Sequence, residues 1–259
     1  MKNLFTHLDE IRKRIGANSA VVTLDFDGTL APTVPYYSKS KMSADMHRVL
    51  RTCARRFPTA IVTGRMLSDV QKRVRVRGIS FAGNHGFEFF IVGKRSQVRI
   101  PREKLRALRK ARRQLSRALQ IFKGVTIEDK RLTFFIHYRH ARKADVPAVR
   151  RAVFQTVREG GSGQLLHTGE GIEALNIVPA MNRNKGTAAR VMFARLRTGR
   201  AAVPIFIGDD ASDEYAFRTL RGGITVKVLS GGGQKSAARY AVRNVEGVRK
   251  FLLWLSELR

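Results

Sequence analysis

Hydrophobic and polar positions follow two kinds of pattern along this chain. Near both ends, short continuous apolar runs alternate with segments in which apolar residues recur every three or four positions. Such runs are typical of strands buried on both faces, and the spaced segments are typical of amphipathic helices. The expected strands are 20–26, 58–65, 78–86, 202–210 and 223–228. Their alternation with helices predicts an α/β fold with a Rossmann-like, doubly wound parallel sheet.

The middle of the chain has a different pattern. Residues 87–100 and 125–139 alternate between apolar and polar positions, as antiparallel strands do. Helices are expected at 102–120 and 145–159, followed by a strand pair at 164–171 and 172–179. We therefore expect an inserted α+β cap domain at 86–175. The core domain is then formed by 1–85 and 176–259.

Polar groups that can perform chemistry follow the expected core strands. In open α/β sheets, sites form beyond the carboxyl ends of the strands, so these groups are expected to converge. The set contains five carboxylates, one hydroxyl and one ammonium group: Asp25, Asp27, Asp209, Asp210, Asp213, Thr63 and Lys185. Clustered carboxylates repel one another, and a hard divalent cation such as Mg²⁺ would offset that repulsion.

The pair Asp25 and Asp27 fits a two-step reaction. One carboxylate can act as a nucleophile, and the other can protonate the leaving oxygen and then activate water. Gly28 allows a tight turn, while Thr63 and Lys185 could hold phosphoryl oxygens. Each piece also has a local structural interpretation: a capped turn, a helix cap or a surface lysine. Their order and strand-end positions favour the catalytic interpretation.

Four motifs resemble those of the haloacid-dehalogenase (HAD) superfamily of phosphatases. They are DFDGT at 25–29, VTGR at 62–65, NKG with Lys185, and GDDASD at 208–213. The resemblance implies that Asp25 is the nucleophile and Asp27 the general acid and base. It also implies Mg²⁺ held by Asp25, the backbone carbonyl of Asp27, and Asp209. Asp210 and Asp213 would then have supporting positions.

Longer segments are similar to the trehalose-6-phosphate phosphatase family. They are 62–70, 81–88, 127–139 and 207–217. The resemblance implies hydrolysis of trehalose 6-phosphate in trehalose biosynthesis. It also implies a set of substrate-binding residues: Arg65, His85, Glu88, Glu128, Lys130 and Arg139. The alternatives are a structural histidine at 85 and a solvated surface pair at Glu128 and Lys130.

One segment departs from that family's pattern. The family usually has a Glu, followed two residues later by a basic residue, before the Pro that leads into NKG. Here Asn176 and Val178 stand at those positions. An amide can still bind a sugar hydroxyl, but without charge assistance. We therefore expect Asn176 to bind substrate, and another phosphorylated disaccharide or glycoside, such as sucrose or glucosylglycerol phosphate, remains an alternative.

The charge of the chain is strongly positive. Its 259 residues include 50 Lys and Arg against 20 Asp and Glu, a formal net charge of +30. Such a charge attracts anions, so a sugar phosphate partner and non-specific polyanion binding are both expected. No nucleic-acid motif accompanies it, and the basic helix at 102–120 is interpreted as a solvated face. A non-catalytic anion- or nucleic-acid-binding protein is the rival from another class.

Other features bound the cellular setting. The sequence has no run of eighteen apolar residues and no secretory signal at its N-terminus, so no membrane association is expected. The single Cys53 indicates a reducing, cytoplasmic location. We expect a monomer without a fused synthase domain.

Overall fold

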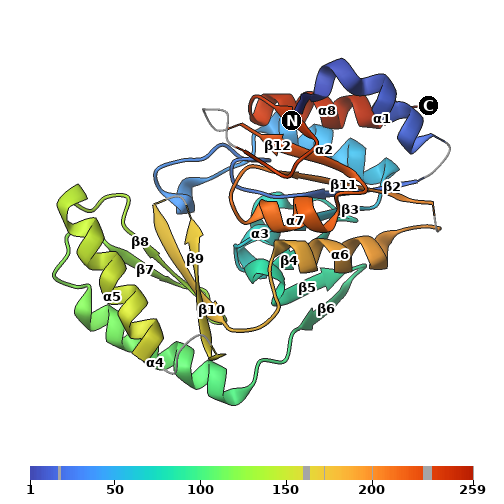
Figure 1. Cartoon of the computed structure of the whole chain (residues 1–259). Coiled ribbons are helices and arrows are strands. Elements are labelled where there is room, and N and C mark those ends of the chain that lie inside the picture. Colours follow the sequence, from blue (N-terminus) through green and yellow to red (C-terminus); the bar gives the residue numbers. More distant parts are fainter. Residues whose placement is uncertain (17–18, 160–163, 172, 200, 230–234, 259) are drawn as a thin grey trace. The chain divides into compact units, whose positions relative to one another are not determined.

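A computed structural model describes residues 1–16, 19–159, 164–171, 173–199, 201–229 and 235–258. The chain divides into two units. Figure 1 colours the ribbon by position in the sequence, so that the residues of each unit can be found. The core unit contains residues 1–97 and 183–259, and the cap unit contains residues 98–182. Each unit has its own hydrophobic core.

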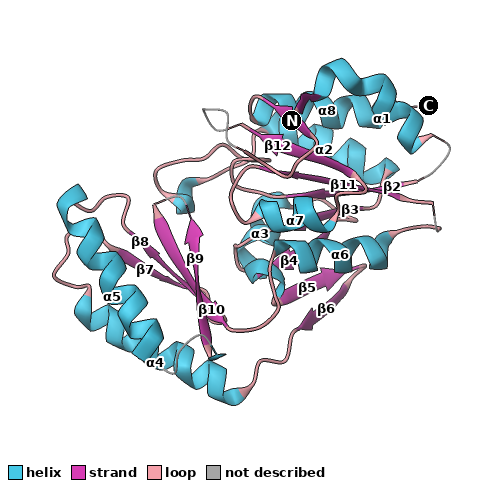
Figure 2. Ribbon diagram, in the orientation of Figure 1, coloured by secondary structure: helices cyan, strands magenta, loops and turns pink. Residues whose placement is uncertain are grey.

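The core unit is built on a nine-stranded sheet in the order β1-β13-β12-β11-β2-β3-β4-β5-β6 (Figure 2). In this order, each strand from β1 through β13, β12, β11, β2 and β3 to β4 is parallel to its neighbour. β5 and β6 then continue the sheet in antiparallel pairing. Their bounds are β1 Lys2–Asn3, β2 Ala20–Leu24, β3 Thr59–Val62, β4 Ser80–Gly83, β5 Glu88–Ile91, β6 Lys94–Gln97, β11 Val203–Gly208, β12 Ile224–Val228 and β13 Tyr240–Val242. The predicted parallel α/β sheet is confirmed.

Helices cover both faces of the core sheet. On one face, α1, α2, α3 and α8 bury apolar side chains against alternate strand residues. On the other, α6 and α7 pack together, and Phe217 of α7 contacts Phe206 of β11 edge to face. The bounds are α1 Leu8–Ile15, α2 Ala44–Arg56, α3 Leu67–Val74, α6 Lys185–Leu196, α7 Asp213–Thr219 and α8 Val245–Glu257, with short 3₁₀ segments at Leu4–His7, Tyr37–Lys39 and Asn84–Gly86. Helices on both faces make the sheet doubly wound.

The cap unit is a four-stranded antiparallel sheet with two helices. The strand order is β7-β8-β10-β9. The bounds are α4 Arg102–Ala118, β7 Thr126–Asp129, β8 Phe134–His137, α5 Val146–Glu159, β9 Leu166–Gly171 and β10 Ala174–Pro179, with a 3₁₀ segment at Lys143–Asp145. Leucines of α4 and valines of α5 pack on Phe134, Ile136 and Ile177. One face of this sheet is therefore its hydrophobic core.

The boundaries of the units differ from the expected 86 and 176. β5 pairs with β4 through Phe81 and Phe90, and β6 then pairs with β5, so residues 88–97 extend the core sheet. β10, at 174–179, pairs with β8 and β9 of the cap sheet. Alternating patterns predict antiparallel strands, but they do not say which sheet those strands join.

No helix in the described ranges is long and apolar enough to cross a membrane.

Candidate functional site

The core candidates lie where neighbouring parallel strands end. Asp25 directly follows β2, Thr63 follows β3 and Asp209 follows β11. The backbone N–H of Asp25 donates to the carbonyl of Ile207 at 2.9 Å, which ties the first strand end to the β11 strand. All three side chains are buried. The convergence predicted from the order of the strands is therefore present in the structure.

Lys185 lies at the centre of this group. It is the first residue of α6, whose start is fixed by a capping box between Asn184 and Thr187. Its ammonium group is 2.8 Å from Asp213 Oδ1, 3.0 Å from Asp25 Oδ2 and 3.4 Å from Asp210 Oδ1. Since the Lys185 side chain is only 2% exposed, the surface-lysine interpretation does not hold. Its burial disfavours the charged form, but the three carboxylates outweigh that effect and raise its pKa.

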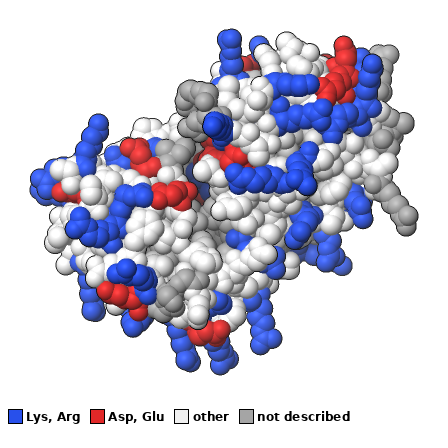
Figure 3. Space-filling view, viewed as in Figure 1, with Lys and Arg blue, Asp and Glu red and all other residues white. Residues whose placement is uncertain are grey.

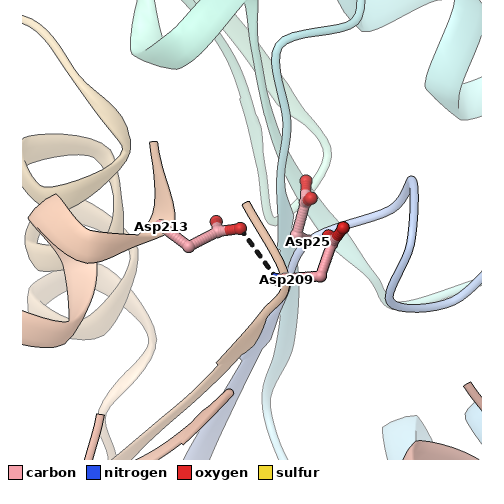
Figure 4. A group of neighbouring side chains, drawn as sticks. All are labelled: Asp25, Asp209 and Asp213. Atoms are coloured by element: carbon pink, nitrogen blue, oxygen red, sulfur yellow. Dashed lines mark hydrogen bonds between the residues drawn. The ribbon is translucent and has the colours of Figure 1, made fainter. Parts of the chain in front are cut away.

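Three buried carboxylates form a candidate metal centre. Oxygen atoms of Asp25, Asp209 and Asp213 lie within 4.8 Å of one another. Figure 4 shows Asp25 and Asp209 side by side, with Asp213 reaching from α7 toward the backbone of Asp209. Oxygen-only ligands suit a hard divalent cation. Of the three, only Asp25 and Asp209 were expected as ligands.

The local charge balance also fits a cation. Four carboxylates, at positions 25, 209, 210 and 213, lie around the ammonium groups of Lys185 and Lys227. Among the described residues, Asp209 has no ion-pair partner, and only the Thr29 hydroxyl donates to it, at 3.4 Å. Burial, followed by repulsion from Asp210 and Asp213, raises the pKa of Asp209 to about 8. A divalent cation would neutralise this excess negative charge.

Asp213 and Asp210 also build the loop itself. One oxygen of Asp213 accepts the backbone N–H groups of Asp209 and Asp210, both at 3.0 Å. Asp210 Oδ1 accepts the backbone N–H groups of Ser212 and Asp213 at the start of α7. Burial opposes ionisation of Asp210, but Lys185 and these hydrogen bonds lower its pKa. Both residues thus hold the carboxylate loop in place.

Gly28 is required by the geometry of the same site. Its φ is +76°, and a Cβ atom there would lie 2.0 Å from Asp209 Oδ2. Its N–H donates to the carbonyl of Ala31 at 2.7 Å, closing the turn that follows Asp27. A side chain at position 28 would therefore displace the Asp209 carboxylate.

Asp27 is held by Arg65. It does not belong to the carboxylate cluster, which consists of Asp25, Asp209, Asp210 and Asp213. Arg65 Nε and Nη2 donate to the two Asp27 oxygens at 2.6 and 2.7 Å. Arg65 also donates to Asp69 at 2.8 Å and to the carbonyl of Tyr37 at 2.6 Å. The Arg73 side chain shares Asp69 and donates to the carbonyl of Ser40. Arg65 was expected to bind substrate, and the structure places its buried guanidinium on the general acid and base candidate.

His85 and Glu88 have different surroundings. A Cβ atom at Gly64 would lie 2.7 Å from the His85 ring, so the imidazole packs against the backbone next to Thr63. Glu88 accepts the N–H of Leu67, the first residue of α3, and the side-chain amide of Asn84. Glu88 thus caps a helix, a role that no local sequence pattern indicates because the helix begins 21 residues earlier.

Lys227 is a buried residue that the sequence analysis missed. It lies on β12, donates to the carbonyl of Asp210 at 3.3 Å and is 3.8 Å from Glu214. A lysine inside an otherwise apolar strand run was the available indication, since unpaired lysines are rarely buried.

The cap candidates gather on the second face of the small sheet, the face turned away from α4 and α5. Strand register places Glu128, Phe135 and Asn176 in one row across β7, β8 and β10. Lys130 lies 3.4 Å from Glu128 and over the Phe135 ring. His137, which was not expected, is 3.0 Å from Glu128. The spacing of Phe135, His137 and Arg139 by two residues would have indicated it.

The cap residues differ in how fully their polar atoms are used. Burial opposes ionisation of Glu128, but His137 and Lys130 lower its pKa. Arg139 donates to Glu173 at 2.8 Å, at one end of the sheet. Asn176 Oδ1 is buried and has no hydrogen-bond partner among the residues that the structure describes. A buried acceptor without a donor is costly unless a ligand supplies one.

A family model described as trehalose-phosphatase matches residues 23–246. The chain belongs to this family. The match includes both the carboxylate cluster and the cap cluster, which consists of Glu128, Lys130, Phe135, His137 and Asn176. The trehalose-phosphatase resemblance drawn from the motifs is therefore confirmed.

Relatives named as trehalose-phosphate phosphatases match most of the chain. It is 30% identical to "Probable trehalose-phosphate phosphatase D" of Arabidopsis thaliana over 97% of this chain and 71% of that protein. It is 35% identical to a trehalose-phosphate phosphatase of Mycobacterium avium over 85% of this chain, and spans 58% of that relative. The C-terminal domain of C. albicans trehalose-6-phosphate phosphatase shares the fold, with a TM-score of 0.85, 18% identity, and coverage of 100% and 98%.

Proposed function

We propose that this protein hydrolyses trehalose 6-phosphate to trehalose and phosphate, through a phosphoryl group carried on Asp25. The observation that carries the proposal is the buried contact of Lys185 with Asp25, beside the Asp209 carboxylate, in a chain of the trehalose-phosphatase family. A nucleophile, a fixed cation and a metal-binding carboxylate are the parts that phosphoryl transfer requires.

In the first step, an oxygen of Asp25 attacks phosphorus and the bond from phosphorus to the sugar oxygen breaks. Asp27 gives its proton to that leaving oxygen. Lys185 and Thr63 stabilise the phosphoryl oxygens while negative charge develops on them. For this step, one Asp27 oxygen must carry a proton and release its hydrogen bond from Arg65.

In the second step, Asp27 removes a proton from water, which attacks phosphorus and frees Asp25. The two hydrogen bonds from Arg65 hold both Asp27 oxygens in place. We therefore propose that Arg65 positions Asp27 and does not bind the sugar.

We propose Mg²⁺ as the cation of the carboxylate cluster. Asp25, Asp209 and the backbone carbonyl of Asp27 would hold it, with Asp213 keeping the Asp209 loop in place. When bound, it supplies positive charge to the phosphate oxygens and offsets the excess carboxylate charge.

We propose that the second face of the cap sheet binds the sugar. Glu128 and Asn176 Oδ1 are acceptors for sugar hydroxyl groups, and Lys130 and Arg139 are donors. Phe135 lies in the same row as Glu128 and Asn176, with Lys130 over its ring. We propose that His85 and Glu88 do not bind the sugar. The His85 ring packs against the backbone next to Thr63, and Glu88 caps α3.

A second candidate substrate follows from Asn176. Since its acceptor lacks the charge of the carboxylate expected there, a different phosphorylated disaccharide or glycoside is the alternative substrate. We further propose a cytoplasmic monomer. Gel filtration and cell fractionation test these two points.

The test is phosphate release from a panel of sugar phosphates, with Mg²⁺ or with EDTA. We expect trehalose 6-phosphate to be hydrolysed fastest and EDTA to abolish the activity. Faster hydrolysis of another sugar phosphate would retain the mechanism and refute the substrate. No hydrolysis, even of an activated phosphate ester, would favour the non-catalytic rival.

A further inference from the structure

The solvent-facing side of α4 carries a straight row of arginines, which we call the α4 stripe. Its members are separated by four, three, four and four residues, so they lie along one side of the helix. All are exposed: Arg102, Arg106, Arg109, Arg113 and Arg117. At 1.5 Å per residue, the stripe is roughly 22 Å long. Figure 3 shows Lys and Arg side chains along the lower edge of the view, where Figure 1 places α4.

The α4 stripe has no acidic partner among the residues that the structure describes. The neighbouring Arg112 is paired with Asp129, whereas none of the five stripe arginines forms an ion pair. Like charges four residues apart, and positive charges near a helix N-terminus, destabilise a helix. A bound polyanion would remove both effects.

The apolar side of α4 is already occupied. Leu108, Ala111 and Leu115 are buried in the core of the cap unit. A helix that binds a membrane surface needs its apolar side free to enter the lipid. The stripe can therefore offer only charge and hydrogen bonds to a partner.

A hollow adjoins the C-terminal half of the stripe. Its volume is about 380 Å³, and it is lined by Arg112, Arg113, Ser116, Arg117, Ile127 and Asp129. Arg112 is paired with Asp129 there, so Arg113, Arg117 and the hydroxyl of Ser116 are the donors that this recess offers to phosphate oxygens. No aromatic residue belongs to the stripe, so base stacking is not available there.

We propose that the α4 stripe binds the phosphate backbone of double-stranded nucleic acid without sequence preference. Arginine binds phosphate through paired donors, and the stripe matches the length of about six base pairs at 3.4 Å each. This binding is separate from the proposed phosphatase function, because the stripe includes no residue of the carboxylate cluster.

The test compares two triple variants that each lose three positive charges. The stripe variant is Arg106→Gln, Arg109→Gln and Arg113→Gln. The control is Arg55→Gln, Lys72→Gln and Arg77→Gln. These residues belong to the core unit and are exposed, and their side chains form no ion pair with a described residue. Binding of a labelled duplex of about 20 base pairs is measured by fluorescence anisotropy over a range of salt.

We expect the stripe variant to lose at least about tenfold in affinity, and its salt slope to fall by about 2.7 for three lost contacts. The control should lose less than about twofold, with its slope unchanged. Equal losses would mean that net charge alone binds DNA and would overturn the proposal. Stripe-dependent binding to phosphatidylserine vesicles, without duplex binding, would also overturn it. Phosphatase activity should be unchanged in the stripe variant, which separates this result from the proposed function.

Discussion

The carboxylate cluster of the core unit and the second face of the cap sheet differ in how completely their polar groups are used. In the core, Lys185 contacts three carboxylates and Asp213 contacts two backbone N–H groups, so the groups are held by one another. In the cap, Glu128 contacts Lys130 and His137, but no group in the described part of the chain donates to the buried Asn176 Oδ1. Under the proposed function, the charges that act on phosphorus are fixed in advance, whereas Asn176 keeps an acceptor for the sugar. The following predictions test that contrast.

The largest effect is expected from Asp25→Asn. The amide cannot attack phosphorus, so kcat should fall by about 10⁴-fold or more for every phosphate ester. Phosphate release from trehalose 6-phosphate and from p-nitrophenyl phosphate measures this, with circular dichroism as the check on folding. Activity within tenfold of wild type would show that Asp25 is not the nucleophile.

Gly28→Ala should also damage the core site strongly. The new methyl group would collide with the Asp209 carboxylate, so kcat should fall by about 100-fold through misplacement of the site. Gly78→Ala is the matched control, because φ at Gly78 is +82° and no atom lies within 4 Å of its added Cβ. The control should lose only about 1–2 kcal/mol of unfolding free energy from its backbone and keep its activity. Equal effects of the two variants on kcat would refute the collision.

Arg65→Lys tests the positioning of Asp27. Lysine cannot donate to both Asp27 oxygens, so kcat for trehalose 6-phosphate should fall by about 10- to 100-fold. Hydrolysis of p-nitrophenyl phosphate should fall less, because its leaving group needs little protonation. Arg73→Lys, which changes the neighbour on Asp69 without touching Asp27, should leave that ratio unchanged. A rise in KM alone would instead support sugar binding by Arg65.

Asn176→Ala tests the cap cluster. We expect KM for trehalose 6-phosphate to rise by about tenfold with little change in kcat, since one hydrogen bond to the substrate is lost. The same variant should hydrolyse p-nitrophenyl phosphate normally. Thr168→Val serves as the control. Thr168 lies on the neighbouring strand β9, and its buried hydroxyl oxygen also has no hydrogen-bond partner among the described residues. A loss of activity on both substrates would place Asn176 in the stability of the cap.

The smallest effect concerns pH and the cation. Asp209 has its pKa raised to about 8 in the folded protein, above its usual value of 3.8. Between these values the folded state holds a proton that the unfolded state lacks, so stability in EDTA should fall as pH rises from about 4 to 8. Mg²⁺ should therefore raise Tm more at pH 8 than at pH 5. Asp209→Asn should reduce this difference, and Asp25 and Asp213, whose pKa values burial also raises, should keep the rest; an unreduced difference in the variant would refute the role of Asp209.

The sequence by itself determined the architecture of the core and the chemistry of its site. Apolar runs and helical spacing are local properties, and parallel strands bring their carboxyl ends to one edge whatever their separation along the chain. The sequence alone therefore groups Asp25, Thr63, Lys185 and Asp209 at one sheet edge.

Only the tertiary structure decided the partners of the longer polar side chains and the membership of the sheets. Arg65 lies on Asp27, Glu88 caps α3, and β5 and β6 extend the core sheet. The burial of Lys227 beside Asp210 is likewise a result of tertiary packing. Periodic patterns give the direction in which a side chain leaves its own element. The atom that it meets depends on how elements distant in the sequence pack together.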